Sequence, residues 1–156
     1  MNIIEAKESE LKSILDLQSL AYQSEAILYD DFTMAPLIQS LDNLNMDLKK
    51  GKILIAKIDD YIVGSVRAII HNNKCEIGRL IVHPANQNQG IGTALLNEIE
   101  NYFKTVEVYE LFTGHKSLKN ISLYTKLGYK KTKEVLVSEK VTLIYLQKIV
   151  VNKRVI

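Results

Sequence analysis

Apolar residues at helical spacing mark two segments in the first third of the chain. Behind a short predicted strand at residues 3–7, the first stripe consists of Leu11, Ile14, Leu15 and Ala21. The second follows Pro36, a residue that suits the first position of a helix, and consists of Leu37, Leu41, Leu44 and Leu48. Residues 24–35 lie between the stripes and have no clear period, so we expect them to form a loop.

A strand-like pattern begins at residue 52. Residues 52–58 and 61–70 are rich in Ile and Val, and Asp59-Asp60 between them favours a tight hairpin. The rest of the chain predicts, in order, a strand at 74–82, a helix to about 103, a strand at 106–113, a helix at 119–127, and strands at 129–137 and 141–148. The order βααβββαβαββ combines antiparallel hairpins with one strand–helix–strand crossover, which indicates an α/β domain of the mixed α+β kind.

Composition narrows the class of protein without indicating a chemistry. A chain of 156 residues fits a single domain, residues 1–156, in which we expect 149–156 to form a loose tail. The formal net charge of +2 is too weak to make nucleic acid the default partner, and no apolar run approaches the ~18 residues of a membrane span. The single cysteine, Cys75, excludes an internal disulfide and suits a reducing environment. We therefore expect a cytoplasmic protein with neither a nucleic-acid nor a membrane partner.

The segment with the clearest chemical signal runs from a strand, through a polar loop, into a helix at residues 80–96. Gly90 and Gly92 let a bulky anion approach the backbone, and the helix start offers free N–H groups and a partial positive charge. The same residues would also fit a plain tight turn with a glycine cap and no ligand. A P-loop would need a Lys that is missing here, and a dinucleotide fingerprint would need a third glycine where Leu95 stands.

Two motifs together suggest a family. Gln87-Asn88-Gln89-Gly90-Ile91-Gly92 matches the pattern Q/R-x-x-G-x-G/A and resembles the acetyl-CoA-binding segment of the GNAT N-acetyltransferase superfamily. The run from Asn120 to Tyr129 resembles that family's downstream N-x-x-x-x-Y-x-x-x-G-[FY] segment. The resemblance covers roughly residues 52–148. It implies a central, mostly antiparallel sheet of about seven strands flanked by about four helices, with acetyl-CoA as the acetyl donor.

The same resemblance implies which residues hold the coenzyme. Main-chain groups of the loop would bind the diphosphate, Thr93 would add a hydroxyl, and the end of the preceding strand would lie beside the pantetheine arm. Gln87 stands where many members carry Arg, so the loop lacks one cation. The implied binding residues are Leu80, Ile81, Val82, Gln87, Asn88, Gln89, Gly90, Ile91, Gly92, Thr93 and Asn120.

Acetyl transfer to an amine needs a proton acceptor for the ammonium and a proton donor for the departing thiolate. By resemblance, Tyr124 is the expected general acid, and an aromatic residue that packs a helix on the sheet is the alternative. Glu76 lies eleven residues before Gln87. This offset resembles that of the catalytic glutamate in the histone-acetylating branch, so Glu76 is the expected general base. A strand glutamate paired with Arg67 or Arg79 is the alternative.

The acceptor is predicted only as a class, a small-molecule or peptide amine. Its candidate contacts are Tyr29, Asp31 and Phe32 in the expected loop, Arg67 on a strand, and His115, which also fits an ordinary loop histidine. The histidines lack metal-ligand spacing, so no metal is expected. Cys75 most resembles a small buried residue. Many relatives pair, which suggests a homodimer. The alternatives to an N-acetyltransferase are a non-catalytic acyl-CoA-sensing module and a nucleotide-binding α/β protein.

Overall fold

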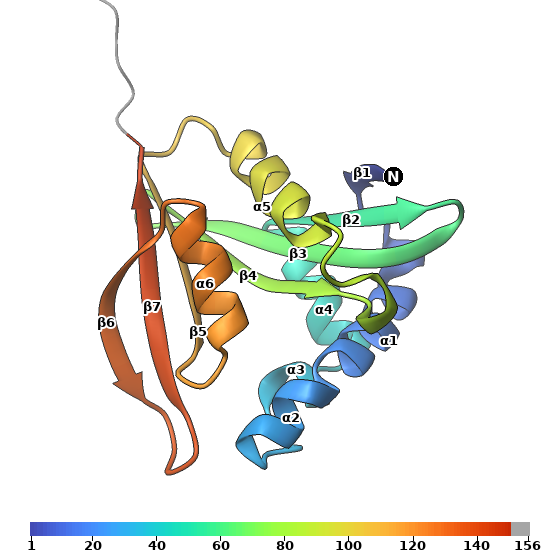
Figure 1. Ribbon diagram of the computed structural model, residues 1–156. Helices are drawn as coiled ribbons and strands as arrows, with labels where there is room; N and C mark the ends of the chain where they lie inside the picture. Colours follow the sequence, from blue (N-terminus) through green and yellow to red (C-terminus); the bar gives the residue numbers. More distant parts are fainter. Residues whose placement is uncertain (151–156) are drawn as a thin grey trace, which may run out of the picture.

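Seven strands form one mixed sheet in the computed structural model, which describes residues 1–150 (Figure 1). Their order across the sheet is β1-β2-β3-β4-β5-β7-β6, and every neighbouring pair is antiparallel except β4 and β5. This architecture confirms the predicted fold class. The strands are β1 (Asn2–Glu5), β2 (Lys52–Ile58), β3 (Tyr61–His71), β4 (Lys74–Val82), β5 (Val108–Gly114), β6 (Lys130–Leu136) and β7 (Thr142–Ile149).

Helices cover both faces of the first half of the sheet. On one face α5 packs Leu95, Leu96 and Ile99 against alternate sheet residues that include Leu54 and Ala56. On the other face α1 and α4 pack against Ile53 and Ile55. Both sets of β2 residues are therefore buried, which explains the continuous apolar run of that strand. The helices are α1 (Leu11–Ala21), α2 (Gln23–Tyr29), α3 (Ala35–Ile38), α4 (Leu41–Lys50), α5 (Ile91–Tyr102) and α6 (Leu118–Lys126).

The segment expected to be a loop is largely helical. α2 occupies Gln23–Tyr29 and ends at Asp30, whose backbone is left-handed with φ 49°. Only Ala26 and Tyr29 of α2 are buried, so two turns carry too few apolar contacts for a period to emerge. The second predicted helix is interrupted. Gln39 is extended, and the Ser40 side chain accepts a hydrogen bond from the amide of Asn43 (3.1 Å), which starts α4 afresh.

β4 and β5 stay together for only three residue pairs. Lys74, Cys75 and Glu76 lie opposite Val108, Tyr109 and Glu110. Beyond Glu76 the two strands diverge, and the sheet opens between them (Figure 1). A register shift against β3 and a left-handed backbone at Arg79 (φ 49°) accompany the divergence. The crossover from β4 to β5 passes through α5, so the start of α5 lies at this opening.

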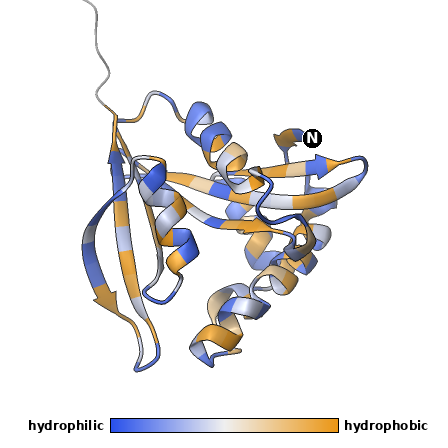
Figure 2. Cartoon of the chain, in the orientation of Figure 1, coloured by the Kyte–Doolittle hydropathy of each residue, from blue (hydrophilic) through white to orange (hydrophobic). Residues whose placement is uncertain are grey.

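The predicted tail at 149–156 begins too early. Ile149 is the last residue of β7, and the Val150 amide donates a hydrogen bond to the Glu107 carbonyl (2.8 Å), whereas residues 151–156 lie outside the described residues. Within residues 1–150, no helix combines the length and the apolar character needed to span a bilayer. Hydrophobic residues dominate the central strands, whereas the loop between β4 and α5 is hydrophilic (Figure 2).

Candidate functional site

A cavity of about 650 Å³ lies where β4 and β5 separate. Four parts of the chain line it: the end of β4, the loop and first turn of α5, the start of α6, and the junction of α1 with α2. The lining residues are 80–82, 86–88, 90–93, 116–120, Leu123, and Ala21, Tyr22, Ser24, Glu25 and Leu28. The cavity thus brings together the two sequence motifs with a helical pair that neither motif contains.

The loop before α5 is shaped so that backbone amides face this cavity. His83 Nδ1 accepts a hydrogen bond from the Ala85 amide (3.0 Å) in the turn Pro84–Asn86, and Asn88 and Gly90 are left-handed, with φ 62° and 80°. No side chain among the described residues caps α5, whose first internal bond runs from the Ala94 amide to the Gly90 carbonyl (3.0 Å). The amides of residues 91–93 are therefore free to bind an anion.

The glycines keep this approach open. A Cβ atom on Gly90 would meet nothing within 4 Å, and one on Gly92 would meet only Leu123 Cδ2 at 3.6 Å and Val82 Cγ2 at 3.9 Å. Lys116 and Lys119 add positive charge on the opposite wall. Free amides, open backbone and nearby cations fit the diphosphate of coenzyme A, and the volume of the cavity suits an elongated ligand.

The predicted coenzyme-binding residues gather at this cavity, with one exception. All of them line it except Gln89. Asn120 lies in the first turn of α6, and its side-chain Nδ2 donates a hydrogen bond to Thr113 Oγ1 on β5 (3.2 Å). This bond fixes the Asn120 amide at the wall. These residues therefore lie at one cavity, and their roles in binding stay predictions.

Tyr124 lies behind the cavity wall. It is buried on α6 and packs against Tyr129, with ring centroids 6.2 Å apart. Burial raises the pKa of Tyr124 above its ordinary value of 10.0, and the charges of Tyr22 and Glu25 raise it further. Tyr124 itself is not among the residues that line the cavity, whereas Asn120 and Leu123 of the same helix are. Its surroundings are those of an aromatic residue that packs α6 on the sheet, and its role as general acid stays a prediction.

Glu76 lies at a second, smaller cavity of about 220 Å³ on the α4 side of the sheet. It is the last β4 residue paired with β5. Its Oε1 lies 3.2 Å from His71 Nδ1, so its contact is with this histidine rather than with either arginine. The carboxylate is partly exposed and remains available to a ligand.

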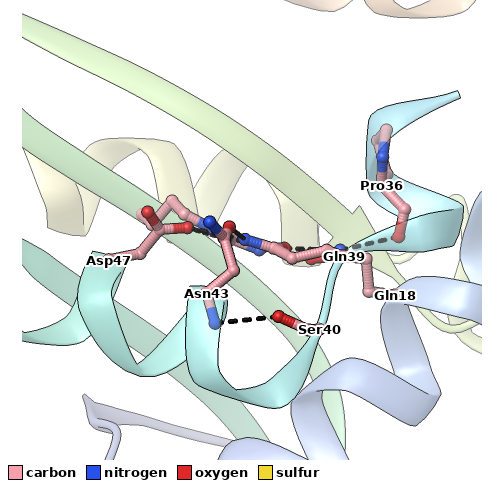
Figure 3. Close-up of polar contacts among 7 residues, drawn as sticks. Gln18, Pro36, Gln39, Ser40, Asn43 and Asp47 are labelled. Atoms are coloured by element: carbon pink, nitrogen blue, oxygen red, sulfur yellow. Dashed lines mark hydrogen bonds and ion pairs between the residues drawn. The ribbon is translucent and has the colours of Figure 1, made fainter.

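Arg67 belongs to a polar network behind the sheet. Its guanidinium donates to Asp47 Oδ2 (2.5 Å) and Gln39 Oε1 (3.2 Å), and also to Gln18. Figure 3 shows how Gln39 in turn reaches Asn43 (2.7 Å) and Asp47 (2.9 Å). The network joins α1, α4 and β3. Burial lowers the pKa of Arg67, and the charge of Arg79 lowers it further.

The other predicted acceptor residues do not line either cavity. Phe32 is 55% exposed, and the Asp31 carboxylate accepts hydrogen bonds from the amide and hydroxyl of Thr33 (2.9 and 2.8 Å). His115 Nδ1 accepts a hydrogen bond from the amide of Thr142 (3.0 Å). These three side chains are positioned by local contacts on the surface around β5, α2 and β7.

Tyr29 joins α2 to the turn between β5 and α6. The Lys116 amide donates to the Tyr29 hydroxyl (2.9 Å), this hydroxyl contacts Ser117 Oγ (2.7 Å), and Ser117 donates to Glu25 Oε2 (2.7 Å). We call Glu25, Tyr29, Lys116 and Ser117 the α2 clamp. It fixes α2 across the opening between β4 and β5, where Glu25, Lys116 and Ser117 also line the large cavity.

The sequence interpretation missed the α1–α2 side of the site. Tyr22 and Glu25 stand three residues apart on consecutive helical turns, but residues 24–35 were expected to be irregular. Burial raises the pKa of Tyr22, while the charges of Arg79 and Arg67 oppose this rise. The sequence indicates Arg79 only as an alternative partner for Glu76. Its left-handed backbone, which the sequence does not reveal, directs it to the smaller cavity.

Cys75 is enclosed in the core beneath α5. Burial raises the pKa of its thiol to about 12, so the thiol stays protonated at neutral pH. It lines neither cavity. Among the described residues, no group of three or more His, Cys, Asp or Glu side chains is arranged to hold a metal ion.

Comparison with known proteins links this geometry to one family. The model of the acetyltransferase (GNAT) family matches residues 11–129. A curated relative, UPF0157 protein YqkA of Bacillus subtilis strain 168, is 37% identical over 59 residues. That match spans 38% of this chain and 17% of the relative, so the chain covers less than a fifth of that protein.

Solved structures share the fold over nearly the whole chain. Smu.2055 of Streptococcus mutans UA159 superposes with a TM-score of 0.81 at 18% identity, covering 96% of this chain and 99% of that one. The PaiA N-acetyltransferase of Thermoplasma acidophilum, solved in complex with coenzyme A, gives 0.72 at 19% identity, covering 96% and 100%. With both motifs at one cavity and a family match across most of its length, the chain belongs to the acetyltransferase (GNAT) family.

Proposed function

We propose that this protein transfers the acetyl group of acetyl-CoA to a primary amine by direct attack of the amine in a ternary complex. The observation that carries the proposal is the large cavity at the opening between β4 and β5. It gathers free amides at the start of α5, the end of β4 and the first turn of α6 around one space of about 650 Å³.

The binding roles follow from the chemistry of the lining groups. The amides of Ile91, Gly92 and Thr93 donate to the diphosphate, where the helix dipole adds a favourable potential. The free edge of β4 at residues 80–82 offers main-chain groups to the amides of the pantetheine arm. Lys116 and Lys119 neutralise phosphate charge that Gln87, in place of a cationic residue, does not. When bound, acetyl-CoA supplies the acetyl group as an activated thioester.

Two side chains carry out the proton transfers to the departing sulfur and from the incoming ammonium. Tyr124 lies on α6 one residue after Leu123, which lines the cavity, and it keeps its proton at neutral pH because burial raises the pKa of its phenol. In the proposed mechanism it gives this proton to the departing sulfur. Glu76 faces the smaller cavity across β4 and accepts a proton from the incoming ammonium, directly or through a water molecule. Cys75 is buried and protonated, which favours direct transfer over an acetyl-enzyme.

The test begins with calorimetric titration of acetyl-CoA into the protein. Gly92→Trp should abolish binding, because the indole would occupy the space that the diphosphate needs. Gly92→Ala is the matched control, since its Cβ meets only ordinary contacts at 3.6 and 3.9 Å, and it should bind within about threefold of the wild type. Equal binding by Gly92→Trp and the wild type would refute the assignment of the loop.

Turnover is then measured with a panel of amines by the release of free thiol. Acetylation of any primary amine, with a rate that depends on both substrates, supports the enzyme. Tight binding of acetyl-CoA with no acetylation of any amine would instead identify a non-catalytic acyl-CoA-binding module.

A further inference from the structure

The smaller cavity is lined by an arginine, Arg79, whose guanidinium also reaches Tyr22 of the large cavity. Its volume, about 220 Å³, is below the ~300–1,000 Å³ typical of sites for drug-sized ligands. Arg79, Arg67, Glu76, Asp47, Lys50 and Phe112 contribute to its walls. A space of this size accommodates a compact molecule or one end of a larger one.

Consecutive residues of β4 line the two cavities. Arg79 lines the smaller cavity and the next residue, Leu80, lines the larger one. Arg79 also reaches Tyr22, which lines the larger cavity. A ligand in the smaller cavity would therefore lie beside the larger one at this point of β4.

One nitrogen of the Arg79 side chain lacks a hydrogen-bond partner. Its Nε is enclosed and has no hydrogen-bond partner within residues 1–150. The backbone of Arg79 adopts φ 49°, a conformation that costs free energy for a residue other than glycine. Arg67, by contrast, is held by Gln18, Gln39 and Asp47. An enclosed donor without a partner is rare in proteins, and this one belongs to a residue that lines the smaller cavity.

The charges around the cavity define what would bind. Arg67 pairs with Asp47, which leaves Arg79 and Lys50 as the cations and Glu76 as the acid. A planar guanidinium matches a carboxylate through two parallel hydrogen bonds, and Glu76 matches an amine. A single excess positive charge suits a carboxylate, with its one negative charge, better than a phosphate with nearly two.

We propose that the acceptor is a free amino acid, bound through its carboxylate to Arg79 with its amine towards Glu76. This inference rests on the proposed function and names the class of its substrate. The amine nitrogen forms a bond to the acetyl carbon, and the thioester carbon–sulfur bond breaks. The ammonium first gives one proton to Glu76, which leaves the neutral amine as the attacking group. The sulfur leaves as the thiol after taking a proton from Tyr124, the second proton lost by the nitrogen restores the Tyr124 phenol, and Glu76 releases its proton to solvent.

The first experiment needs no variant. Initial rates of thiol release are measured for each of the common amino acids, for the corresponding C-terminal amides, for tripeptides, and for phosphoethanolamine. We expect at least one amino acid to be acetylated with a kcat/KM roughly tenfold or more above that of its amide. Amidation makes the amine less basic, which favours the amide chemically, so a preference for the acid would report recognition of the carboxylate.

A second experiment asks whether Arg79 provides that recognition. Arg79→Met should raise the KM for the preferred amino acid roughly tenfold to hundredfold, and should raise the KM for its amide by a much smaller factor. Arg79→Lys keeps the positive charge but not the pair of parallel hydrogen bonds. Its KM for the amino acid should therefore lie between those of the wild type and Arg79→Met. Lys104→Met, an exposed change in the turn after α5, is the matched control. Unchanged calorimetric affinity for acetyl-CoA shows that each variant is folded.

The outcomes separate this inference from the proposed function. Equal or faster acetylation of amides, tripeptides or phosphoethanolamine overturns the amino-acid acceptor, as does a failure of every amino acid while other amines react. An equal effect of Arg79→Met on acid and amide overturns the role of Arg79. Absence of acetyl-CoA binding by the wild type overturns the proposed function itself. Should Arg79→Met not fold, the acid-to-amide ratio of the wild type still decides whether a carboxylate is recognised.

Discussion

At Tyr124, the surroundings of the hydroxyl determine which part it can take in the proposed proton transfer. The ring is buried on α6, and burial raises the pKa of the phenol above 10.0, with Tyr22 and Glu25 adding to the effect. A raised pKa means that the proton is retained to a higher pH, so the phenol carries a proton throughout the neutral range. It is also a weaker acid than a free phenol, so its proton would move only as negative charge develops on the departing sulfur.

Replacing Tyr124 by Phe should therefore affect chemistry more than binding. We expect kcat to fall roughly 100-fold to 10,000-fold, the usual contribution of a general acid, with the Kd for acetyl-CoA within about twofold. In the wild type, deprotonation of Tyr124 should lower the rate only above about pH 10, because its pKa lies above that value. Steady-state kinetics and calorimetry measure these quantities. Tyr61→Phe, at a tyrosine that is 77% exposed in the β2–β3 hairpin, is the control. A normal kcat for Tyr124→Phe would remove the general acid from the mechanism.

At the scale of elements, the α2 clamp explains how a short helix is held across the opening. α2 is only seven residues long, too short to be stable alone. The Tyr29 hydroxyl supplies the tertiary contact, receiving the Lys116 amide bond and meeting Ser117. Gly114 makes room for it, because a Cβ on this residue would lie 2.1 Å from the Tyr29 hydroxyl.

Gly114→Ala should consequently displace Tyr29 and loosen α2. We expect the free energy of unfolding to fall by about 1–3 kcal/mol, the usual cost of overpacking, and acetyl-CoA binding to weaken because Glu25, Lys116 and Ser117 line the large cavity. Urea denaturation and calorimetry test this. Gly78→Ala is the stability control, since a Cβ there meets nothing within 4 Å. If the two variants were equally stable, the clamp would not be holding α2.

The elements also show where sequence patterns reach their limit. Long apolar runs such as 52–58 and 61–70 form the predicted strands, because side chains on these strands are buried in the core. α2 has only two buried residues, and the stripe from Leu37 to Leu48 keeps its spacing across the break at Gln39. Periodicity reports which residues face the core. It does not report whether the backbone is continuous between them.

For the whole molecule, the site depends on a feature that only three-dimensional structure reveals. The motifs at 87–92 and 120–129 predicted two walls of the large cavity, because each carries its own local signal. The third wall, with Tyr22 and Glu25, and the smaller cavity with Arg79 arise from the separation of β4 and β5 and from a bulge with positive φ. Neither has a sequence pattern of its own, so the acceptor side could not be predicted in the same detail.

The opening between the two halves of the sheet should also be visible in amide exchange. Beyond Glu76 the edge of β4 that faces β5 lacks strand partners, and the first amides of α5 lack internal ones. Acetyl-CoA bound between the two halves of the sheet would contact both the edge of β4 and the first amides of α5. Hydrogen–deuterium exchange followed by mass spectrometry should therefore slow in peptides covering residues 78–93 and 116–123 when acetyl-CoA is added. β6, an exposed edge strand distant from the cavity, should exchange at the same rate with and without ligand. Protection confined to β6 and β7 would place the coenzyme elsewhere, whereas protection at 78–93 and 116–123 would place it in the opening of the sheet.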